Sequence, residues 1–359
     1  MICFKDEIGW YLVGKLYIQR IGNSIYNGID TNIIEVKNSE MDKSSVIEQL
    51  SSALGISLVE QLEIALHADD IAILQDFLCW KRIRFLSQGY TEDDVDDMFE
   101  TIRSSFAQGM EKKTRERVTK FINDAIRFLE CAKHQDTASK ERFSDLAKEY
   151  RHSLLNGDRQ HASRLIIESV NSGIKVKDIY IHVFQSSLYE IGHLWQTNQI
   201  TIAQEHFFTA ATQMIMSQLY PYIFANKKNG LRMIAASVDS NMHDIGIRMV
   251  ADFFEMEGWD TYYLGGNAPI QAIIQALQEN NPQLLALSVT ISKQIPTVEE
   301  VIQTIRKDDQ YHRTKVIVGG PPFNLSEGLW KKVGSDGFAR SADEAVSLAA
   351  RLFDLDGHQ

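Results

Sequence analysis

The sequence predicts an α/β protein in which helical segments come first and a parallel sheet follows. Amphipathic stripes with helical spacing run from about residue 45 to residue 224. Beyond residue 230, short apolar runs alternate with helical patterns, as in a parallel sheet covered by helices. We therefore expect a mostly helical N-terminal module at 1–135, a four-helix bundle at 136–228 and a sheet domain at 229–359.

Composition and charge narrow the range of partners. The chain has 359 residues, of which 44% are hydrophobic and 24% charged, as in ordinary soluble proteins. The net charge of −11 disfavours a phosphate backbone, so we do not expect direct DNA binding. Cys3, Cys79 and Cys131 match no metal-binding spacing and are expected to be reduced thiols. No apolar run reaches membrane-spanning length and the start lacks a signal-peptide layout, which predicts a cytoplasmic protein with no membrane contact.

The N-terminal module is expected to be built mainly of helices. Two aromatic and β-branched stretches, Gly9–Gly22 and Ser24–Val36, are interpreted as strands. Helical stripes follow, and two of them begin with a capping pair, Ser45 with Glu48 and Thr91 with Asp94. The predicted helices cover residues 45–68, 69–87, 91–106 and 115–131. No basic recognition helix stands out among them.

Four amphipathic segments joined by short turns predict the helical bundle. A polar link over Ala132–Lys140 precedes them, and the polar stretch Asn226–Gly230 follows. Thr201 with Gln204 forms a capping box at the start of the last segment. The predicted helices cover residues 143–155, 158–170, 176–195 and 201–224.

In the last domain, three apolar runs each end in a polar or glycine-containing motif. The run 231–238 is interpreted as a buried strand and is followed by Asn241-Met242-His243-Asp244-Ile245-Gly246 and a helix over 247–257. The run 284–288 leads into Ser288-Val289-Thr290, and the run 315–320 ends in Gly319-Gly320. Because parallel strands end at one edge of a sheet, where ligands of such sheets bind, these motifs are expected to meet there.

These three motifs together resemble the cobalamin-binding domain of methionine synthase, corrinoid methyl carriers and CarH-type photoreceptors. That family has the pattern D-x-H-x-x-G, then S-x-L or a relative, then G-G, on a Rossmann-like (flavodoxin-like) sheet. The resemblance implies that His243 is the lower axial ligand of cobalt and that Gly319 and Gly320 leave room for the nucleotide base. Ser288 and Thr290 would offer hydroxyls to the buried nucleotide tail. The residues around His243 would also line the cofactor, namely Asn241, Asp244, Ile245 and Gly246.

The sequence departs from that pattern at Asn241, where the family has an acid. An amide can still orient the second imidazole nitrogen of His243, but it cannot raise the basicity of the ligand as a carboxylate does. We therefore expect His243 to bind cobalt with weaker electronic tuning.

A second constellation lies in the bundle, where nine residues separate Trp195 from Glu205-His206. This spacing resembles the W-x9-E-H motif of CarH-type photoreceptors and implies a pocket over the upper face of the corrin. There the indole would shield a group bound to cobalt, Glu205 would bond an adenosyl ribose, and His206 would contact that group or water. Gln196 replaces the histidine that captures cobalt after photolysis in the best-known members, and His193 is predicted to face elsewhere.

The resemblance implies a cobalamin-dependent light sensor, with adenosylcobalamin favoured and methylcobalamin next. Photolysis of the upper bond would rearrange the bundle and signal to the N-terminal module or to a protein partner, so the chain is not expected to be an enzyme. Whether it forms a homo-oligomer is left open. The alternatives are a corrinoid methyl carrier of a methyltransferase system and a cobalamin-responsive transcriptional regulator. The N-terminal module and the Trp195 motif favour the sensor over the carrier.

Overall fold

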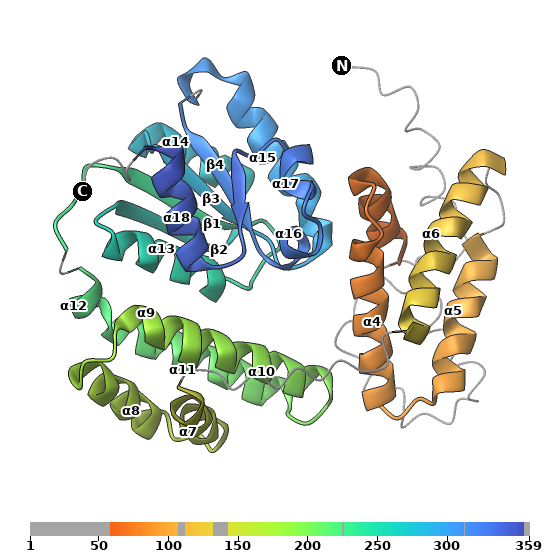
Figure 1. The fold of residues 1–359 in the computed structure, drawn as a ribbon, viewed down its shortest axis with the longest axis horizontal. Coiled ribbons are helices and arrows are strands. Elements are labelled where there is room, and N and C mark those ends of the chain that lie inside the picture. Colours follow the sequence, from red (N-terminus) through yellow and green to blue (C-terminus); the bar gives the residue numbers. More distant parts are fainter. Residues whose placement is uncertain (1–57, 107–111, 132–142, 225, 312, 355–359) are drawn as a thin grey trace. The chain divides into compact units, whose positions relative to one another are not determined.

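The protein is described by a computed structural model that covers residues 58–106, 112–131, 143–224, 226–311 and 313–354 (Figure 1). The chain divides into two compact units, Met1–Gln135 and Asp136–Gln359. The strands expected at 9–22 and 24–36 lie outside the described residues, as does the part of the helix expected at 45–68 that precedes residue 58.

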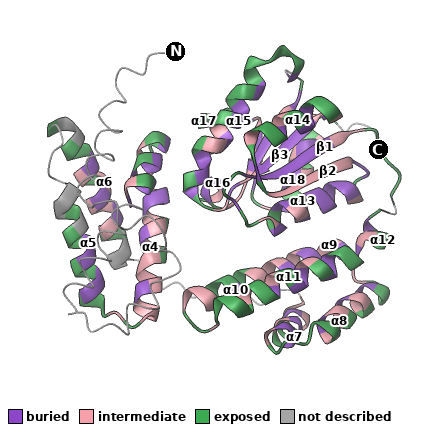
Figure 2. Cartoon of the chain, turned by 180° about the vertical axis from the view of Figure 1, so that it is seen from behind, coloured by how far each residue is buried: buried purple, intermediate pink, exposed green. Residues whose placement is uncertain are grey.

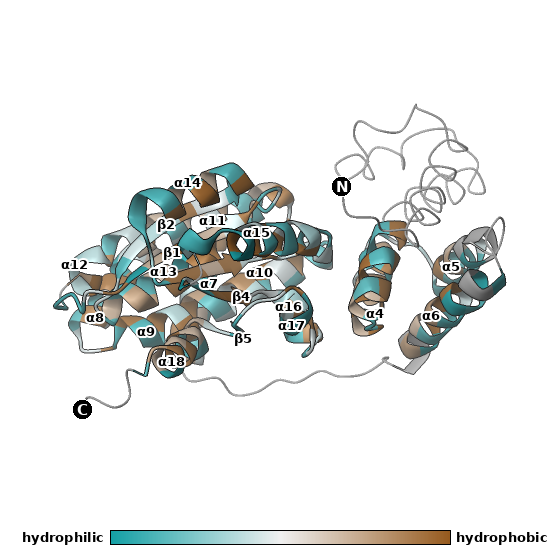
Figure 3. Cartoon of the chain, turned by 90° about the horizontal axis from the view of Figure 1, so that it is seen from above, coloured by the Kyte–Doolittle hydropathy of each residue, from teal (hydrophilic) through white to brown (hydrophobic). Residues whose placement is uncertain are grey.

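The first unit is helical, as expected, over its described part. Residues 58–68 form a helix, and α4 (Ala72–Ser87), α5 (Glu92–Phe106) and α6 (Lys112–Cys131) follow. The predicted cap of α5 is present, because the Thr91 N–H donates to Asp94 Oδ2 (2.9 Å) and the Asp94 N–H donates to Thr91 Oγ1 (3.2 Å). Each helix buries one stripe and leaves a polar side outward, so both colours appear along α4 and α6 in Figure 3.

The second unit begins with the bundle, and its four predicted helical segments are confirmed. They are α7 (Ser144–Leu155), α8 (Arg159–Asn171), the run from α9 (Val176–Ile179) to α10 (Ser186–Gln196), and α11 (Ile202–Gln218). The capping box of Thr201 and Gln204 at the start of α11 is also confirmed. Pro221, which has no N–H to donate, lies in a separate short helix, α12 (Tyr220–Ile223).

One feature of the bundle carried no recognised sequence signal. Between α9 and α10 the chain forms a π-helical segment, Tyr180–Gln185, with aromatic side chains at Tyr180 and Phe184 buried in the bundle core. The segment widens the helix locally without interrupting it.

The sheet is wholly parallel and has the strand order β2-β1-β3-β4-β5, which confirms the flavodoxin-like prediction. Its strands are β1 (Arg232–Val238), β2 (Asp260–Ala268), β3 (Leu284–Ser288), β4 (Lys315–Gly319) and β5 (Gly337–Ala339). The central strands are almost completely buried and appear purple in Figure 2.

Helices cover both faces of the sheet (Figure 1). One face carries α13 (Ile245–Met256) and α18 (Ala342–Leu352), which pack side by side. The other face carries α14 (Ile270–Asn280), α15 (Ile295–Lys307), α16 (Pro321–Leu325) and α17 (Leu329–Lys332). Within the described residues, no helix is long and apolar enough to cross a membrane.

Helix α13 lies between the bundle and the sheet. Three of its residues, spaced four apart, belong to the core of the bundle: Ile245, Met249 and Phe253. Ile247 and Ala251 belong instead to the core under the sheet. Because α13 is buried on both sides, it fixes the bundle against the first loop of the sheet domain.

Candidate functional site

The register of the sheet brings the three sequence motifs to one edge. Ser237 of β1 pairs with Ser288 of β3, and Ser288 pairs with Gly319 of β4. The loops that follow these strands therefore begin side by side. The edge between β1 and β3 is where the strand order reverses, the usual ligand site of an open parallel sheet.

His243 lies in the loop between β1 and α13 with its side chain exposed. The Ser237 hydroxyl donates to the His243 carbonyl oxygen (3.3 Å), which ties the backbone of the loop to the end of β1. Among the described residues, none forms a hydrogen bond or ion pair with the imidazole. The ring is thus presented at the sheet edge with a ligand nitrogen available.

Asn241 acts on the backbone of this loop. It is fully buried; its Oδ1 accepts from the His243 N–H (3.1 Å) and its Nδ2 donates to the Ser288 carbonyl oxygen (3.3 Å). The amide therefore contacts main-chain groups of two motifs, which differs from the expected contact with the imidazole. A side chain only two residues from His243 reaches the nearby backbone more easily than the exposed ring.

A residue that the sequence analysis missed, Asn267 at the end of β2, holds the same loop from the other side. Its Oδ1 accepts from the Ser240 N–H (2.7 Å), and its N–H donates to the Asn241 carbonyl oxygen (2.8 Å). A Cβ on the preceding Gly266 would come within 3.1 Å of that same oxygen. The close approach of β2 thus favours a glycine, and Gly265-Gly266-Asn267 was the signal available in the sequence.

The second and third motifs differ in what they provide. Ser288 and Thr290 are half-buried, and no hydrogen bond joins either hydroxyl to another residue in the described part of the chain. Gly320 has φ +107°, and a Cβ there would lie 1.8 Å from the Val289 carbonyl oxygen. A Cβ on Gly319 would lie 3.1 Å from the Ala339 carbonyl oxygen. The glycine pair therefore lets the end of β4 pass close to its neighbours.

Asp244 connects the sheet to the bundle. Its Oδ1 accepts from Gln213 Nε2 of α11 (2.8 Å), and its Oδ2 accepts from the Tyr263 hydroxyl of β2 (2.7 Å). Burial, followed by the hydrogen bond to Asp244, raises the pKa of Tyr263, so its hydroxyl remains a donor. Arg248 adds a second tie by donating from Nη1 to the Gln213 carbonyl oxygen (3.2 Å).

Glu205 and His206 lie on α11, the helix that Asp244 and Arg248 contact through Gln213. His206 Nδ1 and Glu205 Oε2 are 2.7 Å apart, and the Thr209 hydroxyl donates to Glu205 Oε1 (3.0 Å). His206 and Gln213 are seven residues apart, nearly two full turns, so they lie on the same face of α11. Trp195 is half-buried in the last turn of α10, the neighbouring helix.

The residues present fit a flat macrocycle with an apolar surface. Met242 and Ile291, which flank His243 and Thr290, are exposed by 75% and 40%. Large apolar side chains in loops at a ligand edge are suited to contact with such a ring. An exposed imidazole and two hydroxyls with no partner among the described residues supply polar groups beside them.

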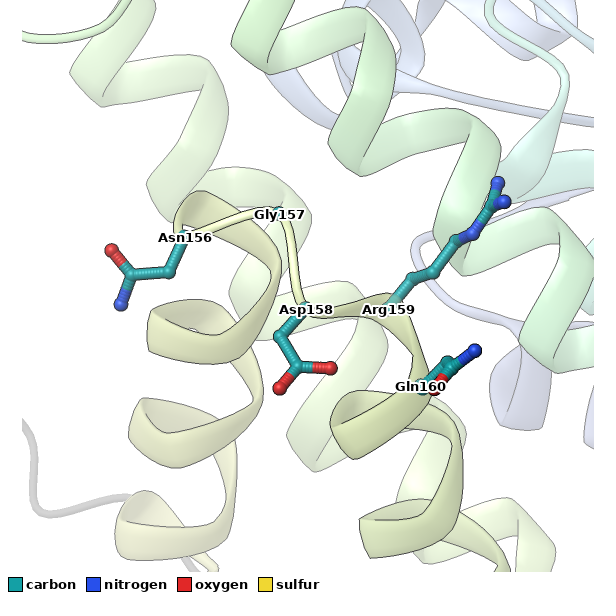
Figure 4. Close-up of a pocket in the computed structure, with 5 residues that line it drawn as sticks. All are labelled: Asn156, Gly157, Asp158, Arg159 and Gln160. Carbon is teal, nitrogen blue, oxygen red and sulfur yellow. The ribbon is translucent and has the colours of Figure 1, made fainter.

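A separate hollow of about 340 Å³ lies at the turn between α7 and α8 (Figure 4). Its side chains point in different directions, and Asp158 is occupied in capping α8, where its Oδ1 accepts from the His161 N–H. It contains none of the predicted site residues, and we assign it no role. Its lining residues are Asn156, Gly157, Asp158, Arg159 and Gln160.

Comparison with known proteins identifies the cofactor of this chain. Two family profiles, each described as a B12 binding domain, match residues 231–349 and residues 146–220. A dimethylamine corrinoid protein of Methanosarcina acetivorans is 24% identical over 191 residues, covering 52% of this chain and 87% of that protein. A corrinoid protein of Desulfitobacterium hafniense is 21% identical over 215 residues, covering 58% of this chain and 97% of that protein. The chain therefore binds cobalamin, as expected.

A solved structure supports the fold. The monomethylamine corrinoid protein of Methanosarcina barkeri matches with a TM-score of 0.53 at 20% identity, covering 59% of this chain and 100% of that one. The fold of the second unit is therefore that of a corrinoid protein.

The expectation of a CarH-type light sensor is wrong. Both relatives are corrinoid proteins; the one from Methanosarcina acetivorans is named for dimethylamine, and neither name refers to light. They favour the alternative function, a methyl carrier. The preference for adenosylcobalamin and the expected signalling partner rested on the sensor interpretation, and these relatives lend them no support.

Proposed function

We propose that this chain is a corrinoid methyl carrier, which holds cobalamin for methyltransferases and is not itself the enzyme. The observation that carries the proposal is the extent of the likeness to corrinoid proteins, which takes in 87–97% of the relatives' own length. The two family profiles fall on the bundle and on the sheet domain, so the likeness covers both parts of the second unit.

Cobalamin, when bound, supplies a cobalt atom that accepts and releases a methyl group. On the sheet side, His243 would bind the cobalt, because a neutral imidazole is a suitable donor to cobalt and its ring is exposed at the edge. Ser288 and Thr290 would hold the nucleotide tail through their hydroxyls. Gly246, exposed in the first turn of α13, would let that tail pass close to the backbone.

On the bundle side, the pair formed by Glu205 and His206 would face the reacting group. Because His206 Nδ1 pairs with the carboxylate, the ring is oriented and Nε2 is the nitrogen left for other contacts. Trp195 would limit access of water from α10. A methyl carrier has to accommodate only a methyl group on the bundle side of cobalamin. We therefore expect methylcobalamin to be the bound form, and not adenosylcobalamin.

The experiment is a methyl-transfer assay on the full chain loaded in the dark with methylcobalamin labelled in its methyl group. An extract of cells that make the chain naturally, supplemented with a thiol acceptor, supplies the methyltransferases. We expect the label to leave the protein faster than it leaves free methylcobalamin in the same extract. A heated extract is the control. Retention of the label on the chain, in an extract that demethylates an authentic corrinoid carrier, would overturn the proposal.

A further inference from the structure

Gln294 is a buried amide between two loops of the sheet edge. It precedes α15 and is 2% exposed. Its Oε1 accepts from the Thr290 N–H (2.9 Å) and from the Ile291 N–H (3.2 Å). Its Nε2 donates to the Ser240 carbonyl oxygen (3.0 Å) in the loop that carries His243. One side chain thus joins the loop after β3 to the loop after β1.

The residue that Gln294 contacts on the first loop has an unusual backbone. Ser240 has φ +63°, in the left-handed region that non-glycine residues seldom occupy. Its N–H is bound by Asn267 and its carbonyl oxygen by Gln294, so the strained peptide is held from both sides. Three residues further on is His243, whose side-chain position depends on this turn.

We propose that Gln294 is a positioning residue for His243: it clamps the turn at Ser240 so that the imidazole is held at the cofactor edge before cobalamin arrives. The proposal rests on the proposed role of His243 as the cobalt ligand. Gln294 is 54 residues from Ser240 in the sequence and belongs to none of the three recognised motifs.

The chemistry of the contact requires a glutamine. One atom must accept two N–H groups while a second atom donates to a carbonyl oxygen, and a side-chain amide does both. A carboxylate of the same shape keeps the two acceptor contacts and places a negative charge against the Ser240 oxygen. A methionine of similar length makes none of the three contacts.

Gln294→Glu removes only the bond to the Ser240 carbonyl oxygen, and Gln294→Met removes all three bonds. Gln303→Met is the control. Gln303 is exposed on α15, and on that helix its side chain bonds only to Glu299. The first readout is hydrogen exchange on the protein without cobalamin. We expect faster exchange at the Asn241 and His243 amides in both Gln294 variants, and parent rates in the strands and in the control.

The second readout is the spectrum and affinity of the cobalamin-loaded protein. We expect the fraction of cobalamin ligated by histidine to fall in both variants, and the Kd for cobalamin to rise about tenfold or more in Gln294→Met. Unchanged exchange at Asn241 and His243 overturns the proposal, as does an increase that is equal throughout the sheet. If instead His243→Ala leaves the parent spectrum unchanged, the ligand assignment fails, and the exchange result still decides whether Gln294 holds the loop.

Discussion

Asp244 Oδ1 accepts a hydrogen bond from Gln213 at 2.8 Å, and this contact links the residue after His243 to the helix that carries Glu205 and His206. The two sides proposed to face cobalamin are therefore joined by a direct side-chain hydrogen bond, beside the bond that Arg248 donates to the Gln213 carbonyl oxygen. The position of the bundle and the shape of the His243 loop depend on each other through it.

Replacing Gln213 with methionine should destabilise the second unit. The variant leaves Asp244 Oδ1 without its donor, and a half-buried carboxylate that loses a partner costs about 1–3 kcal/mol. Urea denaturation of the protein without cobalamin measures the free energy of unfolding. Gln303→Met, at an exposed position, should change it by less than about 0.5 kcal/mol. Equal values for both variants would show that the Asp244–Gln213 contact adds no stability.

Replacing His243 with alanine should affect the cofactor and not the fold. The imidazole is exposed and forms no hydrogen bond or ion pair with the described residues, so the free energy of unfolding without cobalamin should stay within about 0.5 kcal/mol of the parent. The loaded protein should lose the absorption spectrum of histidine-ligated cobalamin and release the cofactor faster. His152→Ala, on an exposed position of α7, is the control. A parent-like spectrum in His243→Ala would exclude this ligand.

Gly320→Ala should unfold the sheet domain at a much lower temperature than the parent. The new Cβ would lie 1.8 Å from the Val289 carbonyl oxygen on a backbone with φ +107°, and both the clash and the conformation are unfavourable. We expect a loss of about 3 kcal/mol or more. Gly328→Ala, where a Cβ meets nothing within 4 Å, should be nearly neutral. Thermal unfolding of the two variants without cobalamin makes the comparison.

Gly246→Ala should separate folding from binding. A Cβ at this position meets nothing within 4 Å, and alanine is the better helix former, so stability without cobalamin should be unchanged or higher by up to about 1 kcal/mol. If the cofactor tail passes close to this turn, the methyl group should weaken cobalamin binding by about tenfold, or about 1.4 kcal/mol. Titration with cobalamin measures the affinity. Parent affinity in the variant would place the tail elsewhere.

Asp252 should make the interface between bundle and sheet sensitive to pH. Burial raises the pKa of its carboxyl from 3.8 to about 6, although the Tyr180 hydroxyl donates to it at 2.7 Å and Arg248 lies nearby. The folded protein therefore takes up this proton at a higher pH than the unfolded chain. Protonation of Asp252 therefore adds to the free energy of unfolding. This contribution is complete below about pH 4 and is lost as the pH rises through about 6.

The measurement is urea denaturation at pH 5 and pH 7 for the parent and for Asp252→Asn. Between these values the parent should lose about 1 kcal/mol more than the variant. Burial also raises the pKa of two other carboxyls, Glu63 and Asp76. Their effect on the free energy of unfolding is the same in the parent and the variant, so it cancels in the comparison. The same pH dependence in both proteins would show that Asp252 titrates normally.

The buried strands could be predicted because their sequence pattern reflects their surroundings. β1, β3 and β4 are apolar runs followed by polar or glycine motifs, as central parallel strands require. β2 was not identified, because it is an edge strand with an exposed tyrosine, Tyr262, and two glycines. β5 has only three residues, too few to show the apolar run by which a strand is recognised.

Residues of the candidate site could be predicted only where they belong to a short sequence motif. His243, Ser288 and Gly320 belong to motifs whose spacing is visible in the sequence. Asn267 holds the His243 loop from β2, and Gln294 holds it from the turn before α15, both by bonding to backbone groups of the loop. The glycines before Asn267 were a weak signal for it, but the residues around Gln294 give no sign of its contact. The function was misjudged from Trp195, Glu205 and His206, because their spacing describes two helices joined by a turn and not the group bound above cobalt.

The alignment of Ser237, Ser288 and Gly319 across three strands also has a consequence for the order of events during synthesis. β1 pairs with β3 across α13, β2 and α14, and β3 pairs with β4 across α15, and such long-range pairings form late. A nascent chain that ends before Gly320 lacks one side of the edge, however well its bundle has formed. Loading with cobalamin should therefore wait until the chain has been made and folded beyond Gly320, and the cofactor should then stabilise only molecules whose sheet is complete.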